Sequence, residues 1–217
     1  MVRTALSVGV GSIVLVAIAS LLWLWLSSEE ALAPTGPAAP ETARLSADET
    51  DPFKGERDAP VTVVVASSFG CPHCKDSAGI LDQLLSLYPD KVRIVWKDLP
   101  ESVGDSYRAA LAARCAQQQG RFWQYHDTLY RNQDILATRA LYGLWARELG
   151  LKEDIFNACF DEGQTKILVD RNIQQALAAG VDQVPYFQIN EDEALSGPQT
   201  LTYLRGIIDL ILSEASE

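Results

Sequence analysis

A continuous run of β-branched residues leads directly into a cysteine pair at the start of a helix, and few folds accommodate that order. Residues 61–66 read Val-Thr-Val-Val-Val-Ala, which is typical of a strand covered on both faces. Residues 72–88 carry apolar side chains at helical spacing, and residues 92–96 form a second apolar run. Because a helix joins the two strands, they are expected to lie parallel. The β-α-β order predicts an α/β fold.

The rest of the chain adds helices and two short strands to this core. From about residue 101 to 162 the patterns are helical only. A helix is predicted at 164–179, short strands at 186–190 and 194–195, and a final helix at 199–212. The sequence therefore predicts a small sheet with an inserted all-helical domain.

Residues 1–27 form a separate apolar segment. Residues 5–26 contain no charge, and at about 1.5 Å per residue a helix of that length crosses a bilayer core of about 30 Å. Arg3 precedes the segment and two glutamates follow it, which favours a cytoplasmic N-terminus with the rest of the chain outside. We expect a retained transmembrane anchor; a cleaved signal sequence is the alternative.

Residues 28–52 are rich in Ala, Pro, Glu and Thr and lack apolar periodicity, so they are predicted to be a flexible linker. The remaining part, residues 53–217, is predicted to be the catalytic domain. A linker this short leaves no room for a dimerisation module, so a monomer is expected. The net charge of −11 argues against nucleic-acid binding, which needs a basic surface.

The predicted chemistry lies in the tetrapeptide Cys71-Pro72-His73-Cys74. Pro72 suits the first helical position, where its missing N–H costs nothing. Cys71 then caps the helix, and its sulfur faces unpaired N–H groups that stabilise a thiolate. His73 adds a donor or a positive charge, and Cys74 lies one turn further in. This pattern predicts an exposed nucleophile above a buried resolving thiol.

Two other interpretations of Cys71 and Cys74 remain open from the sequence. The same positions would suit a purely structural disulfide, and C-x-x-C is also half of a zinc or copper site. No second C-x-x-C group follows in the sequence. We therefore predict no metal and no other cofactor, with the dithiol itself carrying the electrons.

Four segments resemble the DsbA-like thiol:disulfide oxidoreductase family, whose members have a thioredoxin-like fold. They are residues 58–74, which end in Cys-Pro-His-Cys, residues 120–126, residues 180–190, and Ser196-Gly197. The resemblance extends over about residues 53–215. It implies a thioredoxin-like fold with a helical insertion, and the Cys-Pro-His-Cys form is associated with strongly oxidising members.

The resemblance also implies roles for Pro185 and Val184. In that family the proline at the position of Pro185 is cis and packs against the active-site disulfide, at a cost of only about 0.5–1 kcal/mol. The backbone of the preceding residue, here Val184, binds an extended substrate strand. A trans proline that opens an edge strand is the alternative.

One position departs from the family pattern. Many relatives carry a buried acid six residues before the first cysteine, which helps to move protons to and from the buried thiol; here that residue is Val65. Lys97, at the end of the second predicted strand, is a candidate to lie beneath the site. Otherwise water or a different residue must handle the proton of Cys74.

Cys115 and Cys159 lie in separate predicted helices of the insertion. In an oxidising compartment one structural disulfide is the simplest expectation, and some DsbA-like relatives have such a bridge in this region. Two buried free thiols or a second redox relay are the alternatives.

His126 is the only histidine besides His73. It lies on a predicted helix next to Phe122, Trp123 and Tyr125, and clustered aromatic residues of this kind are typical of a packed core. We therefore expect His126 to be structural.

The sequence thus predicts a membrane-anchored oxidoreductase that acts in the periplasm or at the cell exterior. It would donate the disulfide of Cys71 and Cys74 to reduced exported proteins. The resemblance implies re-oxidation by a quinone-linked membrane protein of the DsbB-like or VKOR-like kind. The alternatives are a disulfide reductase or isomerase, and a non-enzymatic copper-binding or chaperone domain that uses the pair as ligands.

Overall fold

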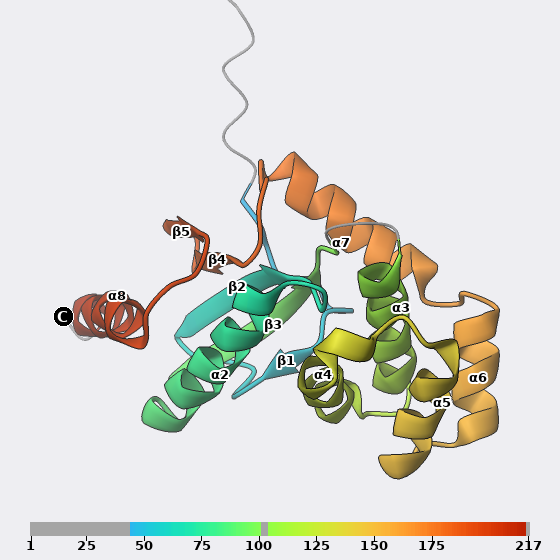
Figure 1. Cartoon of the computed structure of the whole chain (residues 1–217). Helices are drawn as coiled ribbons and strands as arrows, with labels where there is room; N and C mark the ends of the chain where they lie inside the picture. The colour runs from blue at the N-terminus through green and yellow to red at the C-terminus, as the bar shows by residue number, and fades with distance from the viewer. Residues whose placement is uncertain (1–43, 101–103, 216–217) are drawn as a thin grey trace, which may run out of the picture. The chain divides into compact units, whose positions relative to one another are not determined.

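A computed structural model describes residues 44–100 and 104–215, which are built on a sheet with strand order β1-β3-β2-β4-β5 (Figure 1). The strands are β1 (Phe53–Lys54), β2 (Val61–Ser67), β3 (Val92–Asp98), β4 (Tyr186–Ile189) and β5 (Glu193–Ser196). The helices are α2 (Pro72–Leu87), α3 (Asp105–Gln117), α4 (Phe122–Arg131), α5 (Arg139–Glu148), α6 (Glu153–Asp161), α7 (Lys166–Ala178) and α8 (Leu201–Glu214), with a short 3₁₀ helix at Gln133–Ile135.

The centre of the sheet is the predicted parallel pair. Strands β2 and β3 run parallel, with Val61 opposite Val92 and Ser67 opposite Asp98. Strand β4 pairs antiparallel with β2, β5 with β4, and β1 with β3. The α/β prediction is therefore confirmed, whereas the short strand β1 was not predicted, because two residues are too few to show an alternating pattern.

Helices cover both faces of the sheet and also form the insertion. Helices α2 and α8 pack on one face, and α7 packs on the other. Helices α3 to α6 pack on one another at one side of the sheet (Figure 1). They lie between residues 105 and 161, which is the range where the sequence carries helical patterns only.

The insertion contains a disulfide. Cys115 of α3 and Cys159 of α6 are bonded, with 5.9 Å between their Cα atoms, and both are buried. The structure therefore agrees with the first of the three interpretations of this pair, a structural disulfide. In the chain-entropy model, closing a loop of this size contributes up to about 4 kcal/mol.

The ordered domain begins earlier than the sequence predicts. Residues 44–52 were assigned to the flexible linker, but Leu45 is buried against Val64 and Ala176 on the face that α7 covers. Asp51 is buried as well. A single leucine and a single aspartate fix this segment, and neither stands out in a stretch dominated by Ala, Pro, Glu and Thr.

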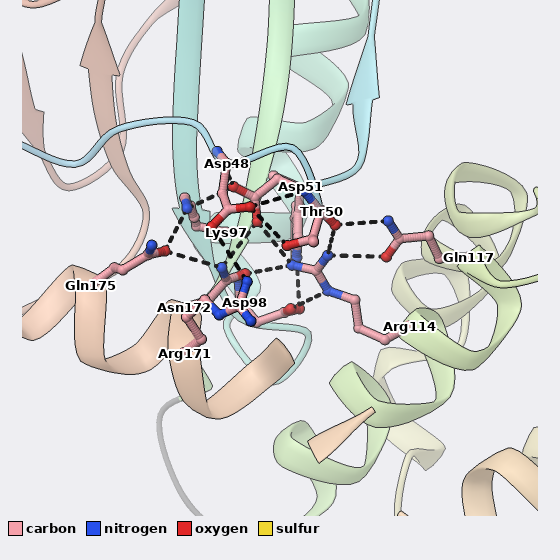
Figure 2. Close-up of polar contacts among 11 residues, drawn as sticks. Asp48, Thr50, Asp51, Lys97, Asp98, Arg114, Gln117, Arg171, Asn172 and Gln175 are labelled. Carbon is pink, nitrogen blue, oxygen red and sulfur yellow. Dashed lines mark hydrogen bonds and ion pairs between the residues drawn. The ribbon is translucent and has the colours of Figure 1, made fainter. Parts of the chain in front are cut away.

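A buried ion network lies on the same face (Figure 2). Lys97 Nζ lies 2.6 Å from Asp51 Oδ2, and Arg114 Nε lies 2.5 Å from Asp98 Oδ2. Arg114 Nη2 is also 3.4 Å from Asp51 Oδ1, and all four side chains are fully buried. Asn172 of α7 bonds to Asp51 and Arg114. The network therefore ties the segment before β1 to β3, α3 and α7, with two cations against two carboxylates.

The predicted transmembrane segment, residues 1–27, and the first part of the linker lie outside the described residues. Within residues 44–100 and 104–215, no helix has both the length and the apolar character needed to cross a bilayer.

Candidate active site

Cys71 lies where β2 passes into α2, and it caps that helix. Its backbone is extended, with φ −91° and ψ 118°, and its Sγ accepts a hydrogen bond from the Cys74 N–H at 3.2 Å. Pro72 occupies the first helical turn. The cap geometry expected from the sequence is therefore present, and it places the sulfur at the positive end of the helix.

The structure brings Val184 and Pro185 to this sulfur from a distant part of the chain. The Val184–Pro185 peptide bond is cis, and the Val184 carbonyl oxygen lies 3.8 Å from Cys71 Sγ. The position follows from the sheet, because Tyr186 opposite Ala66 begins the pairing of β4 with β2. The Pro185 carbonyl also accepts a hydrogen bond from Gly197 at 2.8 Å, which holds the loop against β5.

Cys71 is less accessible than the sequence suggests. The residue is only 3% exposed, whereas Pro72 and His73 are exposed on the helix surface. The Val184 loop covers the sulfur, and Gln133 Nε2 holds the adjacent backbone by donating to the Phe69 and Cys71 carbonyls at 2.8 and 2.9 Å. No motif in the sequence indicates Gln133, because it comes from a short 3₁₀ helix more than sixty residues further along the chain.

Cys74 is the buried member of the pair. It is 1% exposed, and both Cys71 and Cys74 are free thiols in this structure. Burial raises the pKa of the Cys74 thiol far above its usual range, and hydrogen bonding and charge from Cys71 raise it further, while the Ser67 hydroxyl opposes the shift. Cys74 therefore holds its proton at neutral pH.

A small cavity lies beneath Cys74, between the sheet, α2 and α4. Its volume is about 10 Å³, close to the smallest space that holds one water molecule, about 10–15 Å³. Val65 and Trp96 line it from the sheet, so an apolar side chain occupies the position of the expected acid. Lys97 does not lie beneath the site, because successive strand residues face opposite sides and Lys97 points into the ion network.

His126 also lines this cavity. It is 3% exposed, and its ring centroid lies 4.8 Å from those of both Trp96 and Tyr130, so its packed position is confirmed. Its Nδ1 lies 2.8 Å from Asp127 Oδ1. Burial lowers the pKa of His126, although the hydrogen bond and charge of Asp127 act in the opposite direction.

Ser67 and Tyr130 lie on another side of Cys74, and neither was a candidate from the sequence. Ser67 Oγ is 2.9 Å from the Tyr130 hydroxyl, which also donates to the Ser68 carbonyl at 3.3 Å. Burial raises the pKa of Tyr130 well above its usual value. This hydroxyl pair is therefore uncharged at neutral pH.

The described residues offer the cysteine pair no further metal ligands. In residues 44–100 and 104–215 there is no group of three or more His, Cys, Asp or Glu side chains placed to hold a metal ion. The arrangement is instead suited to thiol exchange, with one sulfur at a helix cap and the other buried beneath it.

Comparison with known proteins agrees with this architecture. Residues 47–210 match the family model described as thioredoxin. A thioredoxin-like oxidoreductase from Silicibacter pomeroyi is 24% identical, with a TM-score of 0.67 over 76% of this chain and 94% of its own. The thiol-disulfide exchange protein α-DsbA2 of Wolbachia pipientis is 22% identical, with a TM-score of 0.66 over 76% and 88%. BdbD of Bacillus subtilis is 20% identical, with a TM-score of 0.71 over 79% and 98%.

Similar sequences among curated proteins include Na⁺/H⁺ antiporters called NhaA. That of Salinispora arenicola is 33% identical over 144 residues, which is 65% of this chain and 22% of the antiporter. That of Herminiimonas arsenicoxydans is 33% identical over 139 residues, 64% of this chain and 22% of its own length. Because this chain spans about a quarter or less of these relatives, their antiporter name is not carried over to it. The chain belongs to the thioredoxin family and has the fold of DsbA-like proteins, with its Cys71–Cys74 pair placed for thiol–disulfide exchange.

Proposed function

We propose that the protein is a membrane-tethered, extracytoplasmic disulfide donor that passes the Cys71–Cys74 disulfide to reduced exported proteins. The observation that carries this proposal is the position of the Cys71 sulfur. It accepts the Cys74 N–H at 3.2 Å at the start of α2 and lies 3.8 Å from the Val184 carbonyl. The helix end stabilises a thiolate, and stabilising the reduced form makes a dithiol pair a stronger oxidant.

The reaction begins with the oxidised pair. A substrate thiolate attacks the Cys71 sulfur, the bond to Cys74 breaks, and its electron pair leaves on the Cys74 sulfur. A second substrate thiolate then attacks the substrate sulfur of the mixed disulfide, and Cys71 leaves as a thiolate. The substrate loses two electrons and two protons. Cys74 takes up one of those protons, because burial disfavours its thiolate.

Val184 is proposed to hold the substrate. Its carbonyl oxygen lies beside the reacting sulfur, in a loop that contains the cis Val184–Pro185 bond. A cavity of about 400 Å³ adjoins Val184, with Leu99, Pro100 and Leu177 in its wall. An extended peptide whose cysteine meets Cys71 would place a neighbouring side chain in this space.

The direction of electron flow is tested by the reduction potential of the pair. The full chain, kept in detergent, is equilibrated with glutathione redox buffers beside a Cys71→Ser control. Reference potentials run from about −120 mV for DsbA to about −270 mV for thioredoxin. A value near the upper end is the expected result. A value near the lower end would make the protein a reductase, and stoichiometric metal retained on the thiols would make it a binding protein.

The location and the oxidising partner are part of the same proposal. The uncharged segment 5–26, with Arg3 before it, supports an anchor that leaves the catalytic domain outside the cytoplasm. A quinone-linked membrane protein of the DsbB-like or VKOR-like kind would then re-oxidise the pair. Trypsin added to spheroplasts should degrade the domain, and removal of quinone should leave Cys71 and Cys74 reduced. A domain that resists trypsin until lysis would contradict the topology.

A further inference from the structure

Each catalytic cycle must move a proton to and from the buried Cys74 thiol, and the position of the usual acid is occupied by Val65. When the pair is re-oxidised, Cys74 has to lose its proton before its sulfur attacks Cys71. This requirement rests on the proposed function, in which Cys71 and Cys74 exchange disulfides. The reaction therefore needs a group near Cys74 that gains and loses a proton near neutral pH.

The cavity beneath Cys74 connects it with one such group. Cys74 and His126 line the same space of about 10 Å³. His126 is 3% exposed and its Nδ1 is engaged by Asp127, but no side chain or backbone group within the described residues bonds to its Nε2. A ring nitrogen without a protein partner, on a residue that lines a space suited to one water molecule, is a suitable proton acceptor.

We infer that His126 accepts the Cys74 proton across this cavity when Cys74 attacks the Cys71 sulfur, and returns it when the disulfide is donated. His126 thus acts as the general base for the Cys74 thiol and bonds to neither sulfur. The inference assigns His126 a chemical role beyond the packing that its aromatic neighbours explain.

Asp127 fixes the ring in the form that this role requires. Partial burial opposes ionisation of Asp127, but the hydrogen bond from His126 and the charge of Lys54 hold its pKa below the usual value. An ionised carboxylate 2.8 Å from Nδ1 accepts a hydrogen bond, so Nδ1 carries the hydrogen and Nε2 carries the lone pair.

The other polar groups around the cavity do not fit this role. Tyr130 holds its proton because burial raises its pKa, and its partner Ser67 is a neutral hydroxyl. Lys54 of β1 and Asp82 of α2 also face His126, but they pair with each other at 2.7 Å. Asp82 is half exposed, so this ion pair connects the cavity with solvent.

The step is balanced without any added reactant. Cys71 begins in a mixed disulfide with a partner sulfur, and Cys74 is a neutral thiol. The Cys74 proton passes to Nε2 of His126, the Cys74–Cys71 bond forms, and the partner leaves as a thiolate with the electron pair of the broken bond. With Cys71 in a disulfide, its sulfur no longer adds to the rise in the pKa of Cys74, and burial is the remaining cause that opposes the transfer.

The test uses the full chain in detergent, reduced at Cys71 and Cys74, with a large excess of DTNB. Cys71 reacts first and releases one thionitrobenzoate anion, and Cys74 then displaces the second from Cys71. The second release measures attack by Cys74, and its rate is recorded against pH for the wild type, His126→Gln and His73→Gln. Because the protein has two histidines, these variants assign any histidine inflection.

In the wild type the second rate should rise with pH through an inflection below about 6.5, the ordinary histidine pKa. His126→Gln should slow this phase at least ten-fold at pH 7 and remove the inflection, while the first release changes less than two-fold. His73→Gln should keep the inflection. An unchanged rate and profile in His126→Gln, or an inflection lost in His73→Gln, would overturn the assignment.

Asp127→Asn provides a second route if His126→Gln does not fold. It keeps the imidazole but removes the carboxylate that raises the pKa of His126, so the inflection should move to lower pH. An inflection that stays in place would contradict the inference. The same assay separates the two proposals: a wild-type protein that gives no second release lacks the dithiol reaction itself, whereas a normal second release that is independent of His126 removes only the proton role.

Discussion

The two faces of the sheet handle buried polar groups in opposite ways. On the face covered by α7, Lys97 and Arg114 meet Asp51 and Asp98 in a network of ion pairs and hydrogen bonds (Figure 2). On the face covered by α2, Cys74 lies beside a small cavity lined largely by apolar and aromatic side chains. Strand β3 contributes to both environments: Trp96 lines the cavity and Lys97 points into the ion network, and a hydrogen bond of 2.8 Å from Trp96 Nε1 to Asp98 Oδ1 joins the two.

The difference indicates what each face can do. A buried charge with all its partners in place is held in one state, because losing any partner leaves an uncompensated ion. A buried thiol beside an imidazole with a free lone pair can change its protonation state without breaking the fold. The ion network holds the first residues of the domain in place, whereas the thiol and imidazole beside the cavity can exchange protons.

Removing the reactive sulfur of Cys71 should abolish activity and leave the free energy of unfolding almost unchanged. Cys71→Ser removes the sulfur that receives the substrate thiolate, so oxidation of a reduced peptide should fall to the uncatalysed level. The urea midpoint of the reduced protein should stay close to that of the wild type, because Ser and Cys are similar in size. Residual activity well above background would show that Cys74 can act alone.

Removing a carboxylate from the ion network should lower stability and leave the thiol reaction almost unchanged. Asp51→Ala leaves Lys97 without its carboxylate and Arg114 with one fewer, and removing one partner of a buried ion pair costs about 3–5 kcal/mol. Urea unfolding of the reduced protein measures this loss. The second-release rate of the folded fraction should remain within about two-fold of the wild type, because neither Asp51 nor its partner Lys97 lines the cavity beneath Cys74.

Two variants control for this effect. Asp51→Ala combined with Lys97→Met should be less destabilising than Asp51→Ala alone, because the second change removes the uncompensated ammonium. Arg44→Ala breaks an exposed pair with Glu191 and should cost about 0–1 kcal/mol. If Asp51→Ala lowered the free energy of unfolding no more than Arg44→Ala does, the contrast between the two faces would be wrong.

Ser67→Ala removes a neutral hydroxyl that bonds to Tyr130 and opposes the rise in the pKa of Cys74. It leaves the buried Tyr130 hydroxyl with the Ser68 carbonyl as its remaining partner, at a cost of about 1 kcal/mol. The rate at which Cys74 attacks Cys71 should change much less than in His126→Gln. An equal or larger slowing would place the proton route through Ser67 and Tyr130 instead.

The smallest expected effect is a dependence of stability on pH. Burial lowers the folded-state pKa of His126 below the unfolded value of about 6.5, so protonation favours the unfolded chain. The corresponding stability is present above pH 6.5 and is lost as the pH falls from there to the lowered pKa. Urea midpoints between pH 5 and 7 should show this decline in the wild type but not in His126→Gln. A decline of equal size in both would assign it to other groups.

Much of the reactive face could be predicted from local sequence. The β-branched strand, the proline after Cys71 and the helical spacing up to Tyr88 are short-range signals, and they placed Cys71 at the helix cap. The side of the sheet that Lys97 occupies depends on strand register, which a buried run of uniformly apolar residues does not reveal.

Features that depend on long-range packing were not predictable from the pattern. Asp51 looks like a linker residue until Lys97 and Arg114 are brought to it from distant segments. The low exposure of Cys71 depends on the Val184 loop and on Gln133, which lie more than sixty positions further along the chain. In both cases the partners meet only once the sheet has formed.

The bond between Cys115 and Cys159 has a consequence for biosynthesis. A newly made chain carries four thiols, and two of them must lose a pair of electrons before α3 and α6 are joined. Until that oxidation has occurred, the insertion lacks the covalent link between α3 and α6. The protein is therefore itself a substrate of disulfide formation, and completing its fold takes a two-electron oxidant where the chain folds.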